Sequence, residues 1–275
     1  MKCPYCGNIC SPRADFCPSC GEPFDKMGKP EGARILDELE ELLGKSIPST
    51  DKIEWDTFGV KVENDEITEL GLSACELTTF PEPILRLKSL QALDLRANQI
   101  TALPESFGQL QSLQKLYLYN NQITALPESF GQLQSLQNLN LSWNQITALP
   151  ESFGKLQSLQ ILASSYNQLT TLPNSFGKLE SLQKLWIDNN QLTTLPKSFG
   201  QLQSLQTLSL NSNPITTFPE SFGDLKALQN LNLDSNHLMV LPASFGALQS
   251  IQTLILENNQ NKISIQIKKL EFQSK

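Results

Sequence analysis

The sequence predicts an α/β solenoid, a rod in which successive coils of the chain stack side by side and form one parallel sheet. Two observations support this fold class. The same pattern returns every 23 residues over most of the 275-residue chain, which indicates a repeat architecture. Within each period two leucines separated by one residue, such as Leu93 and Leu95, mark a short strand. Strands that recur once per coil pair at about 4.8 Å per step.

The period is clearest in a column of asparagines at the end of each strand. They are Asn98, Asn121, Asn144, Asn167, Asn190, Asn213, Asn236 and Asn259, and Cys75 takes the equivalent place one period earlier. The chain therefore has nine coils, which would form a curved rod about 40 Å long. An amide can both donate and accept hydrogen bonds, so we expect these side chains to bond backbone groups of successive coils.

The segment between two strands predicts a short helical turn on the outside of the rod. A proline opens it in seven coils, and a Phe-Gly pair follows three residues later, as in Pro104, Phe107 and Gly108. We expect the glycine to end the turn. The phenylalanines fall on the same rung of every coil and should stack as a buried spine, at Phe107, Phe130, Phe153, Phe176, Phe199, Phe222 and Phe245.

One coil departs from the pattern at a core position. The fifth coil has Ser164 where its neighbours have Leu141 and Ile187. The sequence predicts either a small void at this point or a buried hydroxyl that is bonded to nearby backbone.

The repeat unit resembles that of a known family. It reads L-x-x-L-x-L-x-x-N, for example Leu90, Leu93, Leu95 and Asn98, and it resembles a leucine-rich repeat. The phrase N-Q-I-T-A-L-P-E-S-F-G-Q-L-Q-S-L-Q is similar to the 23-residue repeats of the Ras-group-related intracellular leucine-rich repeat proteins. The resemblance covers residues 67–260, about 70% of the chain. It implies a leucine-rich repeat solenoid with a curved parallel sheet on its concave side and short helical or 3-10 turns on its convex side.

The two ends of the rod need atypical caps, because a solenoid exposes apolar edges there. Residues 51–66 predict a strand or hairpin, with Trp55, Phe58, Val60 and Val62 leading into a turn. Residues 261–275 predict a C-terminal cap, because Lys262–Lys268 alternates between polar and apolar residues and could form a last strand with lysines at its edge. A basic docking tail is the alternative.

The N-terminal region predicts a metal site. Cys3, Cys6, Cys17 and Cys20 form two C-x-x-C pairs, each followed by glycine, and Cys10 is left over. Four thiolates make the tetrahedral site that zinc prefers, with iron as the alternative and disulfides disfavoured. Residues 1–24 resemble the short zinc ribbon found at the start of many prokaryotic proteins, which implies one structural zinc ion.

Residues 25–50 predict a linker followed by an acidic amphipathic helix. Gly28–Pro30 reads as the linker, and apolar residues at helical spacing follow until Gly44, at Ile35, Leu36, Leu39, Leu42 and Leu43. Residues 31–66 hold 4 basic and 11 acidic residues, a balance of 4 − 11 = −7. Such a segment is either a solvated face or an acidic platform for a basic partner.

The concave face predicts where a partner binds. In each strand the residues between the leucines point away from the core, onto this face. Five of the seven Tyr and Trp residues of the chain fall there in four consecutive coils, at Tyr117, Tyr119, Trp143, Tyr166 and Trp186. Exposed aromatic clusters are typical of interaction hot spots. The alternative is that these rings pack on one another, or lie at the sheet edge, without binding anything.

The composition weighs against several function classes. A net charge of −7 disfavours nucleic-acid binding, although binding through the zinc ribbon remains the alternative function. A single histidine, His237, and the absence of a triad or phosphate loop weigh against an enzyme: Gly44-Lys45-Ser46 lacks the first glycine of a P-loop. No apolar run approaches the roughly 20 residues of a membrane span. We therefore expect a cytoplasmic, non-enzymatic scaffold that binds a protein partner, and the family resemblance implies a small GTPase or its regulator.

Overall fold

The computed structural model of the protein describes Cys3, Cys6, Asn8 and residues 16–21, 31–54 and 57–259. Several features expected from the sequence lie outside these residues. They are the leftover Cys10, the linker Gly28–Pro30, the cap residue Trp55 and the C-terminal segment Lys262–Lys268.

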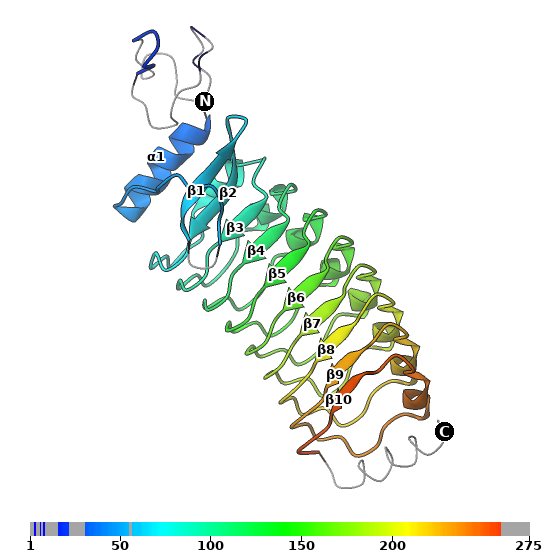
Figure 1. Ribbon diagram of the computed structural model, residues 1–275. Helices are drawn as coiled ribbons and strands as arrows, with labels where there is room; N and C mark the ends of the chain where they lie inside the picture. Colours follow the sequence, from blue (N-terminus) through cyan, green and yellow to red (C-terminus); the bar gives the residue numbers. More distant parts are fainter. Residues whose placement is uncertain are drawn as a thin grey trace.

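The described chain forms a ten-stranded sheet in which the strands follow one another in sequence order (Figure 1). The first two strands are antiparallel and every later pair is parallel. The strands are β1 (Phe58–Glu63), β2 (Glu66–Leu72), β3 (Ala92–Asp94), β4 (Lys115–Tyr117), β5 (Asn138–Asn140), β6 (Ile161–Ala163), β7 (Lys184–Trp186), β8 (Thr207–Ser209), β9 (Asn230–Asn232) and β10 (Thr253–Ile255). The nine parallel strands β2 to β10 belong to the nine predicted coils.

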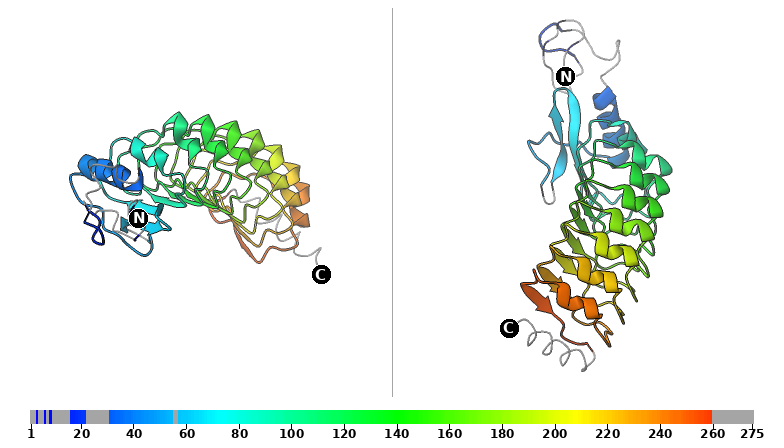
Figure 2. Two further views of the ribbon diagram at one scale, coloured as in Figure 1. Left: turned by 90° about the horizontal axis from the view of Figure 1, so that it is seen from above. Right: turned by 90° about the vertical axis from the view of Figure 1, so that its right-hand side faces the viewer.

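A short 3-10 helix lies on the outer side of the rod in eight coils. These helices are η1 (Glu82–Arg86), η2 (Glu105–Gln109), η3 (Glu128–Gln132), η4 (Glu151–Lys155), η5 (Asn174–Lys178), η6 (Lys197–Gln201), η7 (Glu220–Asp224) and η8 (Ala243–Ala247). Figure 2 shows that they line the convex side of an arc whose concave side is the sheet. The predicted fold class, a solenoid with a curved parallel sheet and 3-10 turns, is confirmed.

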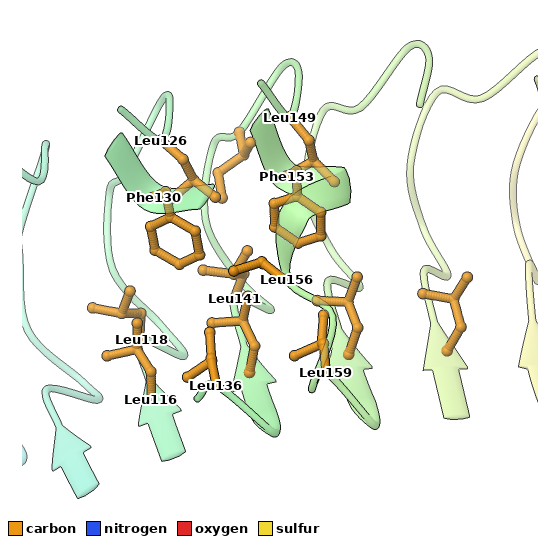
Figure 3. Close-up of a cluster of buried hydrophobic side chains, with 14 of the residues drawn as sticks. Leu116, Leu118, Leu126, Phe130, Leu136, Leu141, Leu149, Phe153, Leu156 and Leu159 are labelled. Carbon is orange, nitrogen blue, oxygen red and sulfur yellow. The ribbon is translucent and has the colours of Figure 1, made fainter. Parts of the chain in front are cut away.

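Leucines from the strands and phenylalanines from the outer turns fill the space between these two layers (Figure 3). Six of the seven spine phenylalanines are fully buried, and Phe245 in the last complete outer turn is 6% exposed. From Phe107 to Phe245 the ring centroids lie 5.8 to 6.2 Å apart and the planes are within 8° of parallel. The predicted spine is therefore a continuous stack that joins each coil to the next.

The predicted asparagine ladder is also present. Asn144 is representative: its Nδ2 donates to the carbonyl oxygens of Leu141 in its own coil, at 3.0 Å, and of Leu118 in the preceding coil, at 2.9 Å. Its Oδ1 accepts from the backbone N–H of Ile123, also in the preceding coil, at 2.9 Å. Each side chain thus satisfies buried backbone groups that the irregular turn leaves without partners.

The glycine after each phenylalanine has a different role from the one expected. Gly154 is the fourth of the five residues of η4 and does not end it with a left-handed conformation. A Cβ built at Gly154 would instead collide with the backbone carbonyl oxygen of Ser175 in the next coil. The residue is glycine because successive outer turns pack backbone to backbone, and no side chain fits between them.

The N-terminal end of the array is closed by a hairpin and a helix. Asn64 and Asp65 connect β1 to β2 with φ values of 49° and 69°, the left-handed conformation typical of tight hairpin turns. The α-helix α1 spans Glu31–Leu43, buries Ile35, Leu36 and Leu39, and is followed by Gly44 at φ 64°. Leu42, expected on the buried face of this helix, is 53% exposed.

Ser164 is fully buried, and among the described residues its hydroxyl has no hydrogen-bond partner. The expectation of a hydroxyl bonded to nearby backbone is therefore wrong. The other alternative, a small void at this position, stays a prediction. An unpaired buried hydroxyl costs about 1 to 3 kcal/mol of stability.

We expect Gly154→Ala to lower the free energy of unfolding by more than 1 kcal/mol, because the added methyl group must push two coils apart. Gly32→Ala is the matched control, because Gly32 lies in the first turn of α1 and a Cβ there meets only the flexible side chain of Ile67, at 3.5 Å. Chemical denaturation followed by circular dichroism measures both. Equal stability of the two variants would contradict the backbone-packing role.

We expect Ser164→Leu to raise the melting temperature, because leucine removes the unpaired hydroxyl and matches the neighbouring coils. The gain should be about 1 to 2 kcal/mol. Ser164→Ala, which removes the hydroxyl without adding volume, should give a smaller gain. A melting temperature below that of the wild type for Ser164→Leu, measured by differential scanning calorimetry, would show that the position has no room.

Candidate functional site

The concave face is built from four positions in each coil, which lie six, four, two and one residues before the ladder position. The residue one before it has a left-handed backbone in all nine coils, with φ between 52° and 57°. It is Ala74, Ala97, Asn120, Trp143, Tyr166, Asn189, Ser212, Ser235 and Asn258. A left-handed backbone costs any residue with a Cβ about 1 kcal/mol or more, so the fold imposes this conformation whatever the side chain.

Trp143 and Tyr166 occupy two of these left-handed positions in adjacent coils. Their rings stack with centroids 4.2 Å apart and planes 18° from parallel. They are nevertheless 48% and 45% exposed, among the most exposed large hydrophobic side chains of the described residues. The two predicted site residues therefore do pack on one another, as the alternative held, but they form a joint platform that still faces solvent.

Tyr117 has a different environment from this pair. It is half-buried, and the guanidinium carbon of Arg96 lies 5.4 Å from its ring centroid. Arg96 is itself buried and forms an ion pair with Asp94 at 2.6 Å. Burial raises the pKa of the Tyr117 hydroxyl. Tyr117 thus marks the border between the buried start of the concave face and its open part.

Trp186 and Tyr119 are both half-buried. Trp186 lies on β7 with the small residues Ala163 and Ser209 directly beside it on the neighbouring strands. The structure therefore places all five predicted aromatics on the concave side of four successive coils but divides them. Trp143 and Tyr166 form the exposed platform, and the other three are partly covered.

Asp188 is a residue that the analysis of the sequence did not single out. Its Oδ2 accepts from the Ser165 hydroxyl at 3.1 Å, and its Oδ1 accepts from the Asn211 backbone N–H at 2.9 Å and from the hydroxyl of Ser209. The carboxylate therefore links three consecutive coils through its hydrogen bonds. Its place between Ser165 and Asn211, the residues one period before and after it, is the sequence signal that could have found it.

The chain covers its own concave face at the N-terminal end. The backbone N–H of Ile53 donates to Glu69 Oε2 at 2.9 Å, and Arg96 Nη2 donates to the carbonyl oxygen of Glu54 at 3.4 Å. Glu69 and Arg96 belong to the concave positions of the first two coils. The open part of the face therefore begins near β4, where Tyr117 lies.

The four predicted metal-ligating cysteines lie together. Their Sγ atoms are all within 4.8 Å of one another, and the Cys3–Cys20 and Cys6–Cys17 pairs are 3.6 and 3.5 Å apart. A tetrahedral site with Zn–S bonds of about 2.3 Å requires S···S distances of about 3.8 Å. None of the four forms a disulfide with another described cysteine, and Cys3 and Cys17 are buried whereas Cys6 and Cys20 are exposed. The cluster could hold a metal ion.

Backbone geometry supports this arrangement of the thiols. The N–H of Ser19 donates to Cys17 Sγ at 3.4 Å, and the N–H of Gly21 donates to the Cys17 carbonyl oxygen at 2.7 Å. Gly21 has a φ of 74°, the left-handed conformation that glycine adopts without strain. The turn after the second cysteine pair thus folds back toward the sulfur atoms, as expected of a metal knuckle.

Two other candidates find ordinary structural roles. Lys45, from the rejected P-loop match, has its Nζ 4.3 Å from the ring centroid of Phe58 and lies beside Cys75. His237 is exposed, and its backbone N–H donates to Ile215 at 3.0 Å.

None of the helices in the described residues is both long enough and apolar enough to cross a membrane.

Comparison with known proteins shows which family and which solved structures the repeats resemble. A family model described as a leucine-rich repeat region matches residues 68–141, 113–191, 137–212 and 185–272. A search of curated protein sequences found no significant match. Among solved structures, a leucine-rich repeat protein of Leptospira interrogans is 34% identical over 70% of this chain and 60% of its own, with a TM-score of 0.54.

Two plant receptor structures are also similar. The peptide hormone receptor RGFR1 in complex with RGF2 is 27% identical over 75% of this chain and 45% of its own, with a TM-score of 0.61. The leucine-rich repeat ectodomain of the receptor kinase GASSHO1/SCHENGEN3 from Arabidopsis thaliana is 24% identical, with a TM-score of 0.55, over 82% of this chain and 41% of its own. The chain thus spans less than two thirds of each of these proteins.

The matching family model covers well over half of the sequence, and the ladder, the parallel sheet and the 3-10 turns agree with it. The chain belongs to the leucine-rich repeat family.

Proposed function

We propose that this protein is a non-enzymatic scaffold that binds a protein partner on the open concave face of its repeats. The observation that supports this most directly is the exposed Trp143–Tyr166 platform. The other coils have Ala, Asn or Ser at these left-handed positions, so neither the ladder nor the core needs a ring there. Large exposed aromatics at the centre of a surface are typical of hot spots for protein binding.

The family and its solved relatives support the same class of function. Leucine-rich repeat proteins are typically protein-interaction scaffolds and usually not enzymes, and RGFR1 was solved in complex with RGF2. For the present chain we propose a peptide or protein ligand on the same kind of surface. A small GTPase or its regulator is the candidate partner that the 23-residue repeat phrase supports.

We also propose that the four-cysteine cluster binds one structural zinc ion. The thiol donors and their spacing support zinc, and a unit this small has almost no core of its own, so the metal would supply most of its folding free energy. Zinc when bound would join Cys3, Cys6, Cys17 and Cys20 into a closed site without an open position for catalysis. A four-thiolate site requires reduced cysteines, and because a reducing compartment keeps thiols reduced, we propose a cytoplasmic location.

We expect the purified protein to contain about one zinc ion per chain, measured by plasma mass spectrometry, and Cys3→Ser/Cys17→Ser to lose it. Cys75→Ser is the matched control, because Cys75 lies in the repeat array and should not affect the metal content. Cobalt reconstitution should give a thiolate-to-metal absorption band in the wild type. Retention of metal by the double variant would contradict the site.

We expect Trp143→Asn/Tyr166→Asn to weaken binding of the partner by about 2 kcal/mol or more, roughly 30-fold in Kd. Asparagine occupies the same left-handed position in other coils, at Asn120 and Asn189, so the variant should fold normally. Affinity capture from native lysate with mass spectrometry identifies the partner, and calorimetry with the purified partner then gives the two affinities.

Ser212→Asn/Ser235→Asn is the control for this experiment. It changes the same position in the seventh and eighth coils, where no aromatic stands. A partner that binds the wild type, the control and the aromatic variant equally would place the interface elsewhere, on the metal site or on α1, and the proposal would fail.

A further inference from the structure

The aromatic residues of the concave face surround a stretch of small, uncharged side chains. In the strand register Tyr117 is followed by Asn140, then Ala163, then Trp186. The Trp143–Tyr166 platform lies on the same two coils as Asn140 and Ala163, where the chain leaves β5 and β6. We call Asn138, Asn140, Ser142, Ile161, Ala163 and Ser165 the floor, and the five aromatics that bound it the frame.

The floor has room for a short segment of extended chain. Tyr117 and Trp186 are three strand steps apart, which is about 14 Å at about 4.8 Å per step. Four residues of extended chain cover nearly the same length, at about 3.4 Å per residue. A segment that runs along the rod axis can therefore lie between these two rings.

The floor offers hydrogen-bonding groups that nothing in the described structure uses. Asn140 Oδ1 accepts from the backbone N–H of Ser142 at 3.0 Å, which fixes the side chain and leaves its Nδ2 without a partner among the described residues. The neighbouring Asn138, half-exposed on the same strand, bonds no described group through either end of its amide. A side-chain amide presents one acceptor and an N–H donor side by side, which is the pattern that a peptide backbone complements.

The charge of the surface restricts the ligand further. None of the floor residues carries a charge, and neither does the Trp143–Tyr166 platform. The nearest charged side chains on the concave face are Lys115 and Lys184, one coil to either side, and Asp188, whose carboxylate already accepts three hydrogen bonds from this chain. The floor strands β5 and β6 carry no charged group of their own, so a charged ligand side chain there would lose water, and only an acidic one beside Lys115 or Lys184 would gain a partner.

We propose that the floor and frame bind an extended, uncharged peptide segment of the partner. Its main chain is bound by the amides of Asn138 and Asn140, and its apolar side chains pack against Trp143, Tyr166 and Trp186. This inference rests on the proposed function and adds the chemistry of the partner: a short stretch of neutral residues in extended form, lying along the rod axis across β4 to β7. A neutral oligosaccharide is the competing ligand, and the test distinguishes it.

The chain contains its own control for the role of the two asparagines. β9 carries the same Asn-Leu-Asn triplet, at Asn230 and Asn232, and Asn232 Oδ1 accepts from the backbone N–H of Asp234 at 3.0 Å, as Asn140 does from Ser142. The neighbours of Asn232 in the register are Ser209 and Ile255, so no aromatic frames this copy. The two triplets match in sequence and local geometry and differ in their surroundings.

The experiment uses the full-length, metal-loaded protein and a random linear peptide library displayed on phage. Enriched peptides are synthesised with a fluorescent label, and their affinities are measured by fluorescence polarisation. We expect neutral, apolar-rich sequences to be enriched. Asn138→Ala/Asn140→Ala should bind them about tenfold or more weakly, as expected when about two hydrogen bonds are lost. Asn230→Ala/Asn232→Ala should bind within about twofold of the wild type.

Four results would overturn the inference. They are enrichment of strongly charged peptides, failure to enrich any peptide, equal affinities for the two asparagine variants, and binding of neutral oligosaccharides on a glycan array in place of peptides. Circular dichroism confirms that each variant is folded. Loss of binding in Trp143→Asn/Tyr166→Asn but not in Asn138→Ala/Asn140→Ala would leave the proposed concave interface intact and refute only the binding of the peptide main chain. Binding that survives in both variants would refute the proposed interface as well.

Discussion

The hydrogen bonds of the ladder asparagines are the constraint on which the rest of the structure depends. Each amide donates to carbonyl oxygens in its own coil and in the preceding one, and it accepts from an N–H of the preceding coil. No other uncharged side chain of that size supplies both kinds of group to three backbone partners. The ladder thereby fixes where the chain leaves each strand, and the left-handed residue just before it follows from that fixed exit.

This uniform backbone separates stability from recognition. The ladder, the leucines and the phenylalanine stack are almost the same in every coil, and they account for the fold. The four concave positions vary freely around them, because their backbone is held by bonds between coils, such as Trp143 N–H to the Ser165 carbonyl at 2.9 Å. A ring can therefore replace a small polar residue at one coil without changing the path of the chain.

Much of this structure follows from the sequence, because in a repeat protein most contacts are between neighbouring coils and are set by the repeated pattern. The period gave the strands, the ladder and the phenylalanine stack, since each coil contacts mainly its neighbours. The role of Gly154 could not be obtained in this way, because it depends on how closely two backbones approach. Nor could the sequence alone show that Ser164 lacks a hydrogen-bond partner, since this depends on the atoms around it.

The candidate sites show the same difference between features set by local sequence and features set by long-range contacts. The four cysteines were identified by spacing alone, because metal knuckles have a fixed local geometry. The five aromatics were assigned to one face by counting back from the ladder, because the alternation of the strand fixes which residues leave the core. Their division was not foreseeable. Arg96, which lies over the ring of Tyr117, also donates to the carbonyl oxygen of Glu54 in the segment before the repeats, and such long-range contacts leave no periodic signal.

The cover over the first two coils gives the rod a direction. Residues of the N-terminal cap already lie on the concave positions of β2 and β3, whereas within the described residues nothing comparable crosses the later strands. A ligand on the open face thus meets a fixed stop at the N-terminal end of that face. Duplication or deletion of whole coils beyond β7 would lengthen or shorten the open concave face without moving its N-terminal limit. The length of the binding surface can therefore change in steps of one repeat while the end near β4 stays in place.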